Sequence, residues 1–93
     1  PTTAKAVFLA GVTAELQGEY EPARKSYVAV INRFTEYYQN KAPQLLRAVR
    51  RECLAAAAAE KQGEAALAVR CYGLAARRLM EQYLRDNPGL VDS

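Results

Sequence analysis

Apolar residues recur at steps of three and four positions along most of the chain, which is the spacing of one face of an α-helix. This pattern predicts four helices, over residues 3–17, 20–40, 43–62 and from 64 to about 86. The second has the clearest apolar stripe, formed by Tyr20, Ala23, Tyr27, Val30, Ile31, Phe34 and Tyr38. Because the connections are short, we expect consecutive helices to pack antiparallel.

One spacing of small and aromatic residues occurs twice, in the stretches GEYEPARKSYVAV and GEAALAVRCYGLA. Each stretch opens with a glycine, Gly18 or Gly63, that is expected to end one helix before the next begins. Small residues stand eight, seven and four positions before each glycine and five positions after it, and a tyrosine stands nine after it. Two antiparallel helices that meet at a tight turn need small residues where they cross and one large side chain beyond the crossing. The sequence therefore predicts two helical hairpins of the same design.

Composition favours an all-α fold, because alanine and leucine are plentiful and runs of β-branched residues are absent. We expect the 93 residues to form a single helical interaction domain, residues 1–93, with a modest core. Since the sequence begins at Pro1 rather than at a methionine, we also expect the domain to be cut from a longer protein. No apolar run approaches the roughly 20 residues of a membrane span.

The repeated stretches resemble the helical hairpin of tetratricopeptide (TPR) repeats. The TPR pattern is a small residue, then glycine, an acid and an aromatic, then alanine, a tyrosine or phenylalanine, and alanine. The resemblance covers most of the chain, but the two glycines are 45 positions apart, whereas the TPR period is about 34. It therefore implies two TPR-like hairpins rather than a regular array.

TPR domains bind partner proteins on an inner face lined by the first helix of each hairpin. For this chain the resemblance implies that a peptide or an amphipathic helix lies in a groove between helices. The implied groove residues are Lys5, Phe8, Val12, Glu15, Arg50, Cys53, Ala57, Glu60 and Lys61. Phe8 is the largest apolar side chain among them, and it is either an anchor point for the partner or part of the domain's own core.

The first three helices are also similar to those of MIT (microtubule-interacting and transport) domains. The similarity rests on GEYEPARKSYVAVINRFTEYY, which matches their long second helix, and on APQLLRAVRREC, which matches the start of the third. MIT domains occur on endosomal-sorting and microtubule-severing ATPases and their adaptors, where they bind short helical or extended motifs. On this alternative the chain is an MIT-like three-helix bundle with an extra C-terminal helix.

Arginines gather on the last two predicted helices of a chain whose formal net charge is +3. A cluster comprises Arg47, Arg50 and Arg51, and a stripe on the last helix comprises Arg70, Arg77, Arg78 and Arg85. These arginines either bind an acidic partner, such as RNA, a phosphoinositide or an acidic protein tail, or form a solvated face. On the second interpretation Glu81 pairs with Arg77 and Arg85, each four positions away.

No pattern of catalytic residues stands out in the chain. It has no histidine, and its five glycines are scattered rather than gathered in a phosphate-binding loop. We therefore predict a non-catalytic domain with no cofactor and no bound metal. Cys53 and Cys71 lack the spacing of a metal site or a secreted framework, so we expect reduced thiols in a cytoplasmic, intracellular protein. The expected partner is another protein, with self-association through an exposed side as an alternative.

Overall fold

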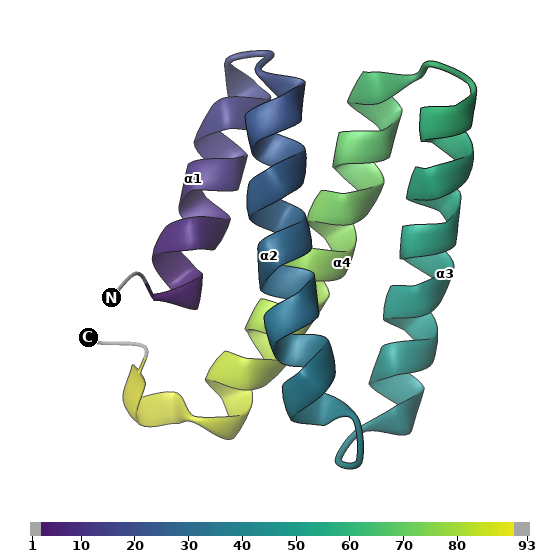
Figure 1. The fold of residues 1–93 in the computed structure, drawn as a ribbon. Coiled ribbons are helices and arrows are strands. Elements are labelled where there is room, and N and C mark those ends of the chain that lie inside the picture. Colours follow the sequence, from purple (N-terminus) through teal and green to yellow (C-terminus); the bar gives the residue numbers. More distant parts are fainter. Residues whose placement is uncertain (1–2, 91–93) are drawn as a thin grey trace.

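The computed structural model describes residues 3–90 as four α-helices followed by a short 3-10 helix (Figure 1). The helices are α1 (Ala4–Leu16), α2 (Tyr20–Tyr38), α3 (Pro43–Lys61) and α4 (Ala65–Asp86), and the 3-10 helix is η1 (Pro88–Leu90). The all-α prediction is confirmed, and each α-helix begins and ends within two residues of its predicted position. η1 follows the end of the last predicted helix and is not among the elements that the sequence predicts.

The residues at the start of α1 and α3 account for where these two helices begin. The Thr3 hydroxyl oxygen accepts a 3.1 Å hydrogen bond from the Ala6 N–H, which satisfies one of the free donors at the start of α1. α3 begins with Pro43, whose missing N–H would have no helical partner at that position. Both starts follow from the sequence alone.

Two turns of the same geometry connect the helices within each hairpin. Gly18 and Gly63 have φ values of 75° and 77°, in the left-handed region that glycine adopts without steric cost. In the first turn the Gly18 N–H donates to the Glu15 carbonyl over 3.0 Å, and the Glu19 N–H donates to the Ala14 carbonyl over 2.9 Å. The bonds around Gly63 have the same pattern and lengths. These paired bonds form a Schellman motif, which ends a helix while satisfying its last carbonyls.

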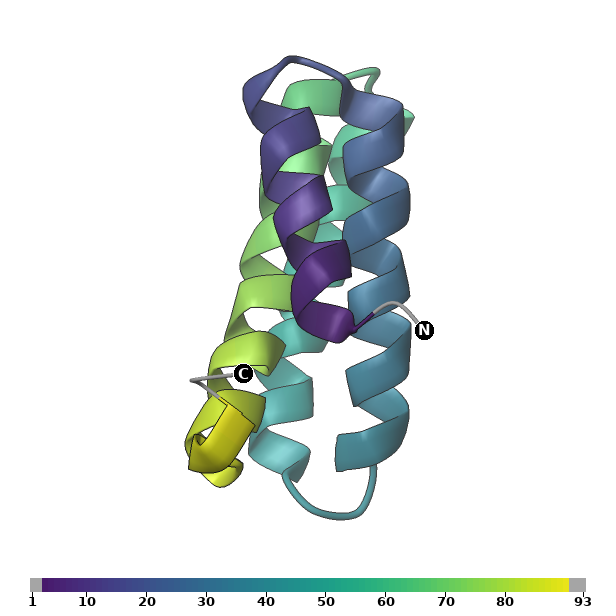
Figure 2. The same cartoon turned by 90° about the vertical axis from the view of Figure 1, so that its left-hand side faces the viewer.

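The two hairpins pack together through α2 and α4, which run in the same direction at the centre of the molecule (Figure 1). α1 covers one side of this pair, mostly against α2, and α3 covers the other side, mostly against α4 (Figure 1 and Figure 2). Within residues 3–90, α1 and α3 do not touch each other, because α2 and α4 lie between them. The result is a flattened bundle with extents of 39 × 27 × 18 Å.

Small residues line the helix crossings, as the repeated spacing predicts. Ala23 and Ala68, five positions after the turn glycines, are 0 % and 1 % exposed. The small residues seven and four positions before each glycine are also buried. Ala10 and Ala55, eight positions before the glycines, face solvent instead, so this part of the predicted crossing is wrong. Gly11 and Ala56, the next residues along the two helices, lie at the crossings instead, because they face the partner helix.

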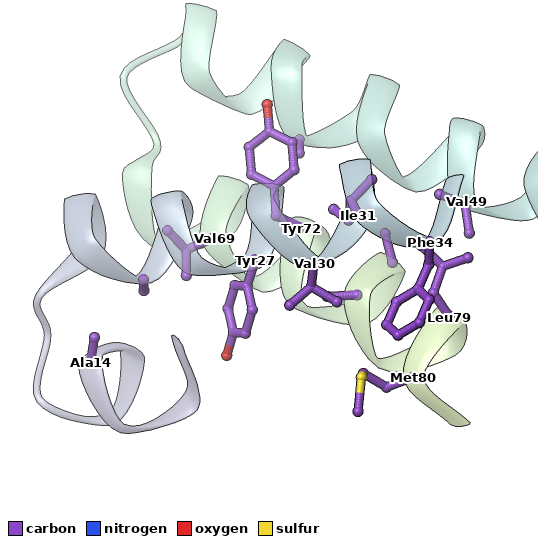
Figure 3. Packing of buried hydrophobic residues seen from close by; sticks show 14 of the residues in the cluster. Ala14, Tyr27, Val30, Ile31, Phe34, Val49, Val69, Tyr72, Leu79 and Met80 are labelled. Atoms are coloured by element: carbon purple, nitrogen blue, oxygen red, sulfur yellow. The ribbon is translucent and has the colours of Figure 1, made fainter. Parts of the chain in front are cut away.

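Tyr27 and Tyr72 occupy matching positions in the two hairpins, and their rings point in opposite directions (Figure 3). The Tyr27 hydroxyl donates to the Glu15 carboxylate over 2.7 Å, and the Tyr72 hydroxyl donates to the Glu60 carboxylate over 2.9 Å. In each hairpin the acid stands three positions before the turn glycine and the tyrosine nine after it. The repeated spacing therefore encodes a hydrogen bond across the hairpin as well as a ring that fills the space between helices.

The core is one hydrophobic cluster that follows the inner faces of α2 and α4 (Figure 3). Its largest fully buried side chains are Tyr27, Leu79, Val30 and Val69. The stripe predicted on α2 is buried from Ala23 onward. Tyr20, predicted as part of that stripe, is 38 % exposed because it is the first residue of α2, at the end of the bundle.

An aromatic cluster joins the far ends of α2 and α4. The ring centroids of Phe34 and Tyr83 are 4.7 Å apart, and those of Tyr37 and Tyr83 are 5.4 Å apart. The Tyr38 hydroxyl donates to the Asp86 carboxylate over 2.6 Å. The last turns of α2 are thus packed against the last turns of α4.

Candidate functional site

Two hollows lie between α1 and α4, which make few contacts with each other. We call these two hollows together the α1–α4 groove. The larger hollow has a volume of about 370 Å³ and is lined by Thr3, Ala4, Lys5, Arg33, Phe34, Met80, Tyr83 and Leu84. The smaller hollow, further along α1, has a volume of about 140 Å³ and is lined by Phe8, Glu15, Tyr27, Arg70, Gly73, Leu74 and Arg77.

The larger hollow exists because α1 is shorter than the helices on which it packs. α1 has 13 residues, whereas α2 has 19 and α4 has 22. In Figure 1 α1 begins part-way along α2, so within residues 3–90 no other α-helix packs on the last turns of α2 and α4 on this side. The apolar side chains of Phe34, Met80 and Leu84 are therefore left to form the floor of the hollow.

The smaller hollow depends on two glycines that admit the Tyr27 ring. A Cβ atom added at Gly11 would lie 2.8 Å from Tyr27 Cε1, and one added at Gly73 would lie 3.0 Å from Tyr27 Cε2. The ring therefore fits between α1 and α4, and Phe8 packs on it with 5.8 Å between the ring centroids. Burial, and then the hydrogen bond to Glu15, raise the pKa of Tyr27 well above its ordinary value, so the hydroxyl stays protonated and donates.

The rim of the groove is basic. Four cationic residues line it, and Glu15 is the single acid among its lining residues within 3–90. Two of the cations, Arg70 and Arg77, are exposed and have no ion-pair or hydrogen-bond partner in the described part of the chain. They stand beside the apolar surface of Phe8 and Leu74. A ligand that carries an anionic group next to an apolar one would therefore be complementary to this surface.

The seam between α2 and α3 differs, because an ion pair crosses it. Arg24 binds Glu60, with 3.3 Å between Nη2 and Oε1, and the guanidinium carbon of Arg24 lies 5.3 Å from the centroid of the Tyr72 ring. These contacts lower the pKa of Glu60, chiefly through the hydrogen bond from Arg24. A hollow of about 320 Å³ remains at this seam, but the paired Arg24 and Glu60 form part of its wall. In the α1–α4 groove, by contrast, Arg70 and Arg77 have no ion-pair partner within residues 3–90.

The nine residues predicted to form one groove are divided between separate surfaces. Those of α1 that line the α1–α4 groove are Lys5, Phe8 and Glu15. Val12 lies partly buried against the core. Those of α3 are Glu60 at the seam with α2, Cys53 and Ala57, which are partly buried, and Arg50 and Lys61, which are exposed. Because α2 and α4 separate α1 from α3, the second wall of the groove comes from α4 instead.

The four arginines predicted as one basic stripe on α4 are also divided, since two line the groove and two have partners. Arg78 forms a bidentate ion pair with Glu52 of α3, at 2.9 Å and 2.8 Å. Arg85 donates to the side-chain oxygen of Gln82 over 3.0 Å. The predicted pairs of Glu81 with the arginines four positions away are wrong for the described residues. Of the four arginines, Arg78 is the one with a carboxylate partner within residues 3–90, and that partner lies on the neighbouring helix.

Phe8, which the sequence left as either anchor or core, has both kinds of contact. It is partly buried against the core cluster and packs on Tyr27, and it also lines the smaller hollow. Sequence reasoning missed the α2 and α4 residues of the larger hollow, which are Arg33, Phe34, Met80, Tyr83 and Leu84. The available signal was the difference between the predicted helix lengths, which implies uncovered ends on the longer helices.

The described residues 3–90 contain no group of three or more potential metal ligands. None of the helices in this range combines the length and the apolar character needed to cross a membrane. Cys53 and Cys71 are free thiols, and burial raises the pKa of the Cys53 thiol, which disfavours the reactive thiolate.

Comparison of the chain with protein-family models, curated proteins and solved structures finds no match.

Proposed function

We propose that this domain is a non-catalytic protein-interaction module that binds an acidic peptide or amphipathic helix in the α1–α4 groove. The observation that carries the proposal is an apolar hollow of about 370 Å³ in the same groove as Arg70 and Arg77, two arginines that have no ion-pair partner within residues 3–90. Ligand sites are commonly hollows of about 300–1,000 Å³, lined by apolar side chains with a few polar groups that set orientation. The larger hollow falls in that range.

In the proposed complex a leucine, methionine or phenylalanine of the partner enters the larger hollow and packs on Phe34 and Leu84. Buried anchors of this kind typically cost about 2 kcal/mol or more of binding free energy when truncated to alanine. Arg70 and Arg77 are seven positions apart on α4, which corresponds to about 10 Å along the helix axis. Two carboxylates that are two turns apart on a partner helix can therefore reach both guanidinium groups.

The family resemblances support an interaction role. We propose a pair of TPR-like hairpins, with an MIT-like domain of an endosomal-sorting or microtubule-severing machine as the alternative, since both families bind short segments of other proteins. The free thiols of Cys53 and Cys71 suit the reducing interior of a cell, which favours an intracellular adaptor or scaffold.

The proposal is tested with fluorescent peptides that place a leucine between glutamates at helical spacing, and with matched peptides that carry lysine in place of glutamate. We expect the acidic peptide to bind and the R70E/R77E variant to weaken binding at least about tenfold, which corresponds to about 1.4 kcal/mol. The matched control is R50E/R51E, which makes the same change in net charge on α3 and should bind the peptide normally. Equal losses in both double variants, or equal binding of the lysine peptide, would overturn the proposal.

A second variant tests the anchor separately from the charges. Ala4 lines the larger hollow, so Ala4→Trp should fill it while every charged side chain of the groove stays in place. We expect this variant to lose the peptide and to keep the helical circular dichroism signal. Normal peptide binding by a folded Ala4→Trp domain would show that the hollow does not hold the anchor.

A second candidate function, self-association, is favoured by the outer face of α1. The exposed stripe on this face has no charged side chain and consists of Ala6, Leu9, Ala10, Thr13 and Leu16. Leu9 is 51 % and Leu16 is 83 % exposed. In an antiparallel pair of copies Leu16 meets Ala6 and Leu9 meets Thr13, so each large side chain faces a small one. Sedimentation equilibrium should then detect a dimer that Leu9→Glu dissociates, whereas a monomer at every concentration would exclude this candidate.

A further inference from the structure

The outward face of α3 combines three arginines with an exposed leucine. α3 forms one edge of the flattened bundle and packs mostly against α4, so its opposite face is uncovered along the helix (Figure 1). The exposed residues of this surface, which we call the α3 outer face, are Gln44, Arg47, Arg50, Arg51, Leu54, Ala55, Ala58 and Lys61. The Leu54 side chain is 62 % exposed.

No carboxylate of α3 neutralises this face. The two acids of the helix, Glu52 and Glu60, bind arginines of α4 and α2 on the inner side of α3. The arginines of the outer face have no ion-pair or hydrogen-bond partner within residues 3–90; they are Arg47, Arg50 and Arg51. The face therefore retains its full positive charge, with Lys61 at its far end.

The apolar part of the face lies among these cations. Leu54 lies about one helical turn after Arg50 and Arg51. Two exposed alanines, Ala55 and Ala58, follow it on the same face. Long cationic side chains can lie along a surface with their charged ends in a polar layer while an apolar side chain between them enters a less polar one. That is the arrangement of an amphipathic helix at the boundary between lipid headgroups and acyl chains.

We propose that the α3 outer face docks the domain on an anionic lipid bilayer, with Leu54 in the headgroup region and the three arginines on lipid phosphates. The positive face is complementary in charge to anionic lipids, and each cation near such a surface strengthens binding about fivefold. Nucleic acid matches the charge but not the leucine, because a phosphate backbone has no apolar layer for it. The face also has no aromatic side chain on which bases could stack.

Co-sedimentation of the whole domain with vesicles tests this docking. We expect binding to vesicles of phosphatidylcholine mixed with phosphatidylserine, no binding to phosphatidylcholine alone, and weaker binding as salt is added. R50E/R51E should weaken binding at least about 25-fold. The charge-matched control R70E/R77E lies outside the face and should weaken it by less than about fivefold. Equal losses in the two variants would overturn the proposal, as would absence of binding to the anionic vesicles.

Leu54→Ser separates insertion from charge attraction, because it leaves every charge in place. We expect it to weaken vesicle binding severalfold, and unchanged binding would overturn the placement of Leu54 in the bilayer. All substituted residues are exposed, so the melting temperatures of the variants should be unchanged. If the R50E/R51E variant does not fold, the neutral variant R50Q/R51Q provides the same test. Tight binding to a DNA duplex that is unaffected by Leu54→Ser, without vesicle binding, would assign the face to nucleic acid instead.

Discussion

The Tyr27 hydroxyl donates a 2.7 Å hydrogen bond to the Glu15 carboxylate across the first hairpin, and Tyr72 repeats this relationship with Glu60 in the second at 2.9 Å. The two copies differ in what else the carboxylate binds. Glu60 also binds Arg24 of the other hairpin, whereas within residues 3–90 Tyr27 is the side-chain partner of Glu15. Within residues 3–90 an ion pair therefore crosses the seam between α2 and α3, and none crosses the seam between α1 and α4. The seam between α1 and α4 is the proposed binding site.

Tyr27→Phe should lower the free energy of unfolding by about 1 kcal/mol, the usual net value of one hydrogen bond. Tyr72→Phe should cost less, because Glu60 keeps its bond to Arg24. Both substitutions preserve the ring and its packing, so they isolate the hydroxyl. Urea unfolding with an unchanged m-value measures the difference. A larger loss for Tyr72→Phe would contradict the asymmetry between the hairpins.

Gly11→Ala should destabilise the domain even though alanine favours a helix over glycine by about 1 kcal/mol. The new Cβ would lie 2.8 Å from the buried Tyr27 ring, whose hydroxyl is also held, so the ring has to move. Such overpacking typically costs about 1–3 kcal/mol. Gly89→Ala, where no neighbouring atom lies within 4 Å, is the control and should change little. A rise in melting temperature for Gly11→Ala would show that the ring is placed elsewhere.

Alkaline pH should destabilise the fold through its buried tyrosines. Burial first, and then hydrogen bonds to Glu15 and Asp86, raise the pKa values of Tyr27 and Tyr38 above the ordinary value, which is near 10. A raised folded-state pKa contributes stability that is fully present below the unfolded pKa and is lost as pH rises above it. Urea midpoints should therefore fall above about pH 10. The fall should be smaller in Tyr38→Phe, and an equal fall would contradict this assignment.

Acid should weaken the seam between α2 and α3. The hydrogen bond from Arg24 holds the pKa of Glu60 below its ordinary value, so the stability it contributes is present above about pH 4.3 and is lost as pH falls through the lower folded-state value. Glu60→Gln should be less stable at neutral pH and should lose less stability on acidification. Glu36→Gln, at an exposed position, is the control and should follow the acid profile of the unchanged domain. Identical acid profiles for all three proteins would exclude Glu60 as a source of the loss.

Local structure followed from the sequence because its causes are local. The period of apolar residues located the helices, and Gly18 and Gly63 located turns that need a positive φ. The spacing of Tyr27 and Tyr72 from these glycines predicted their burial in matching positions.

The relative placement of the hairpins did not follow, because it depends on which helix faces meet. Arg24 and Glu60 are 36 positions apart, and nothing in either hairpin alone indicates that they pair. Gly73 approaches Tyr27 only because α4 packs on α2, which keeps α1 and α3 apart. The α1–α4 groove therefore includes Lys5, Phe8 and Glu15 of the predicted residues, and its second wall comes from α4 rather than from α3. The larger hollow arises because α1 is shorter than α2 and α4, so it depends on the lengths of three helices together.

The central claim, that a partner binds between α1 and α4, is tested most directly by titrating the isotope-labelled domain with the acidic, leucine-bearing peptide and mapping amide chemical shifts. The account predicts the largest changes around Lys5 and Phe8 on α1 and around Arg77 and Leu84 on α4, with the amides of α3 unaffected. Changes centred on Glu60 at the seam between α2 and α3, or no changes at saturating peptide, would contradict it.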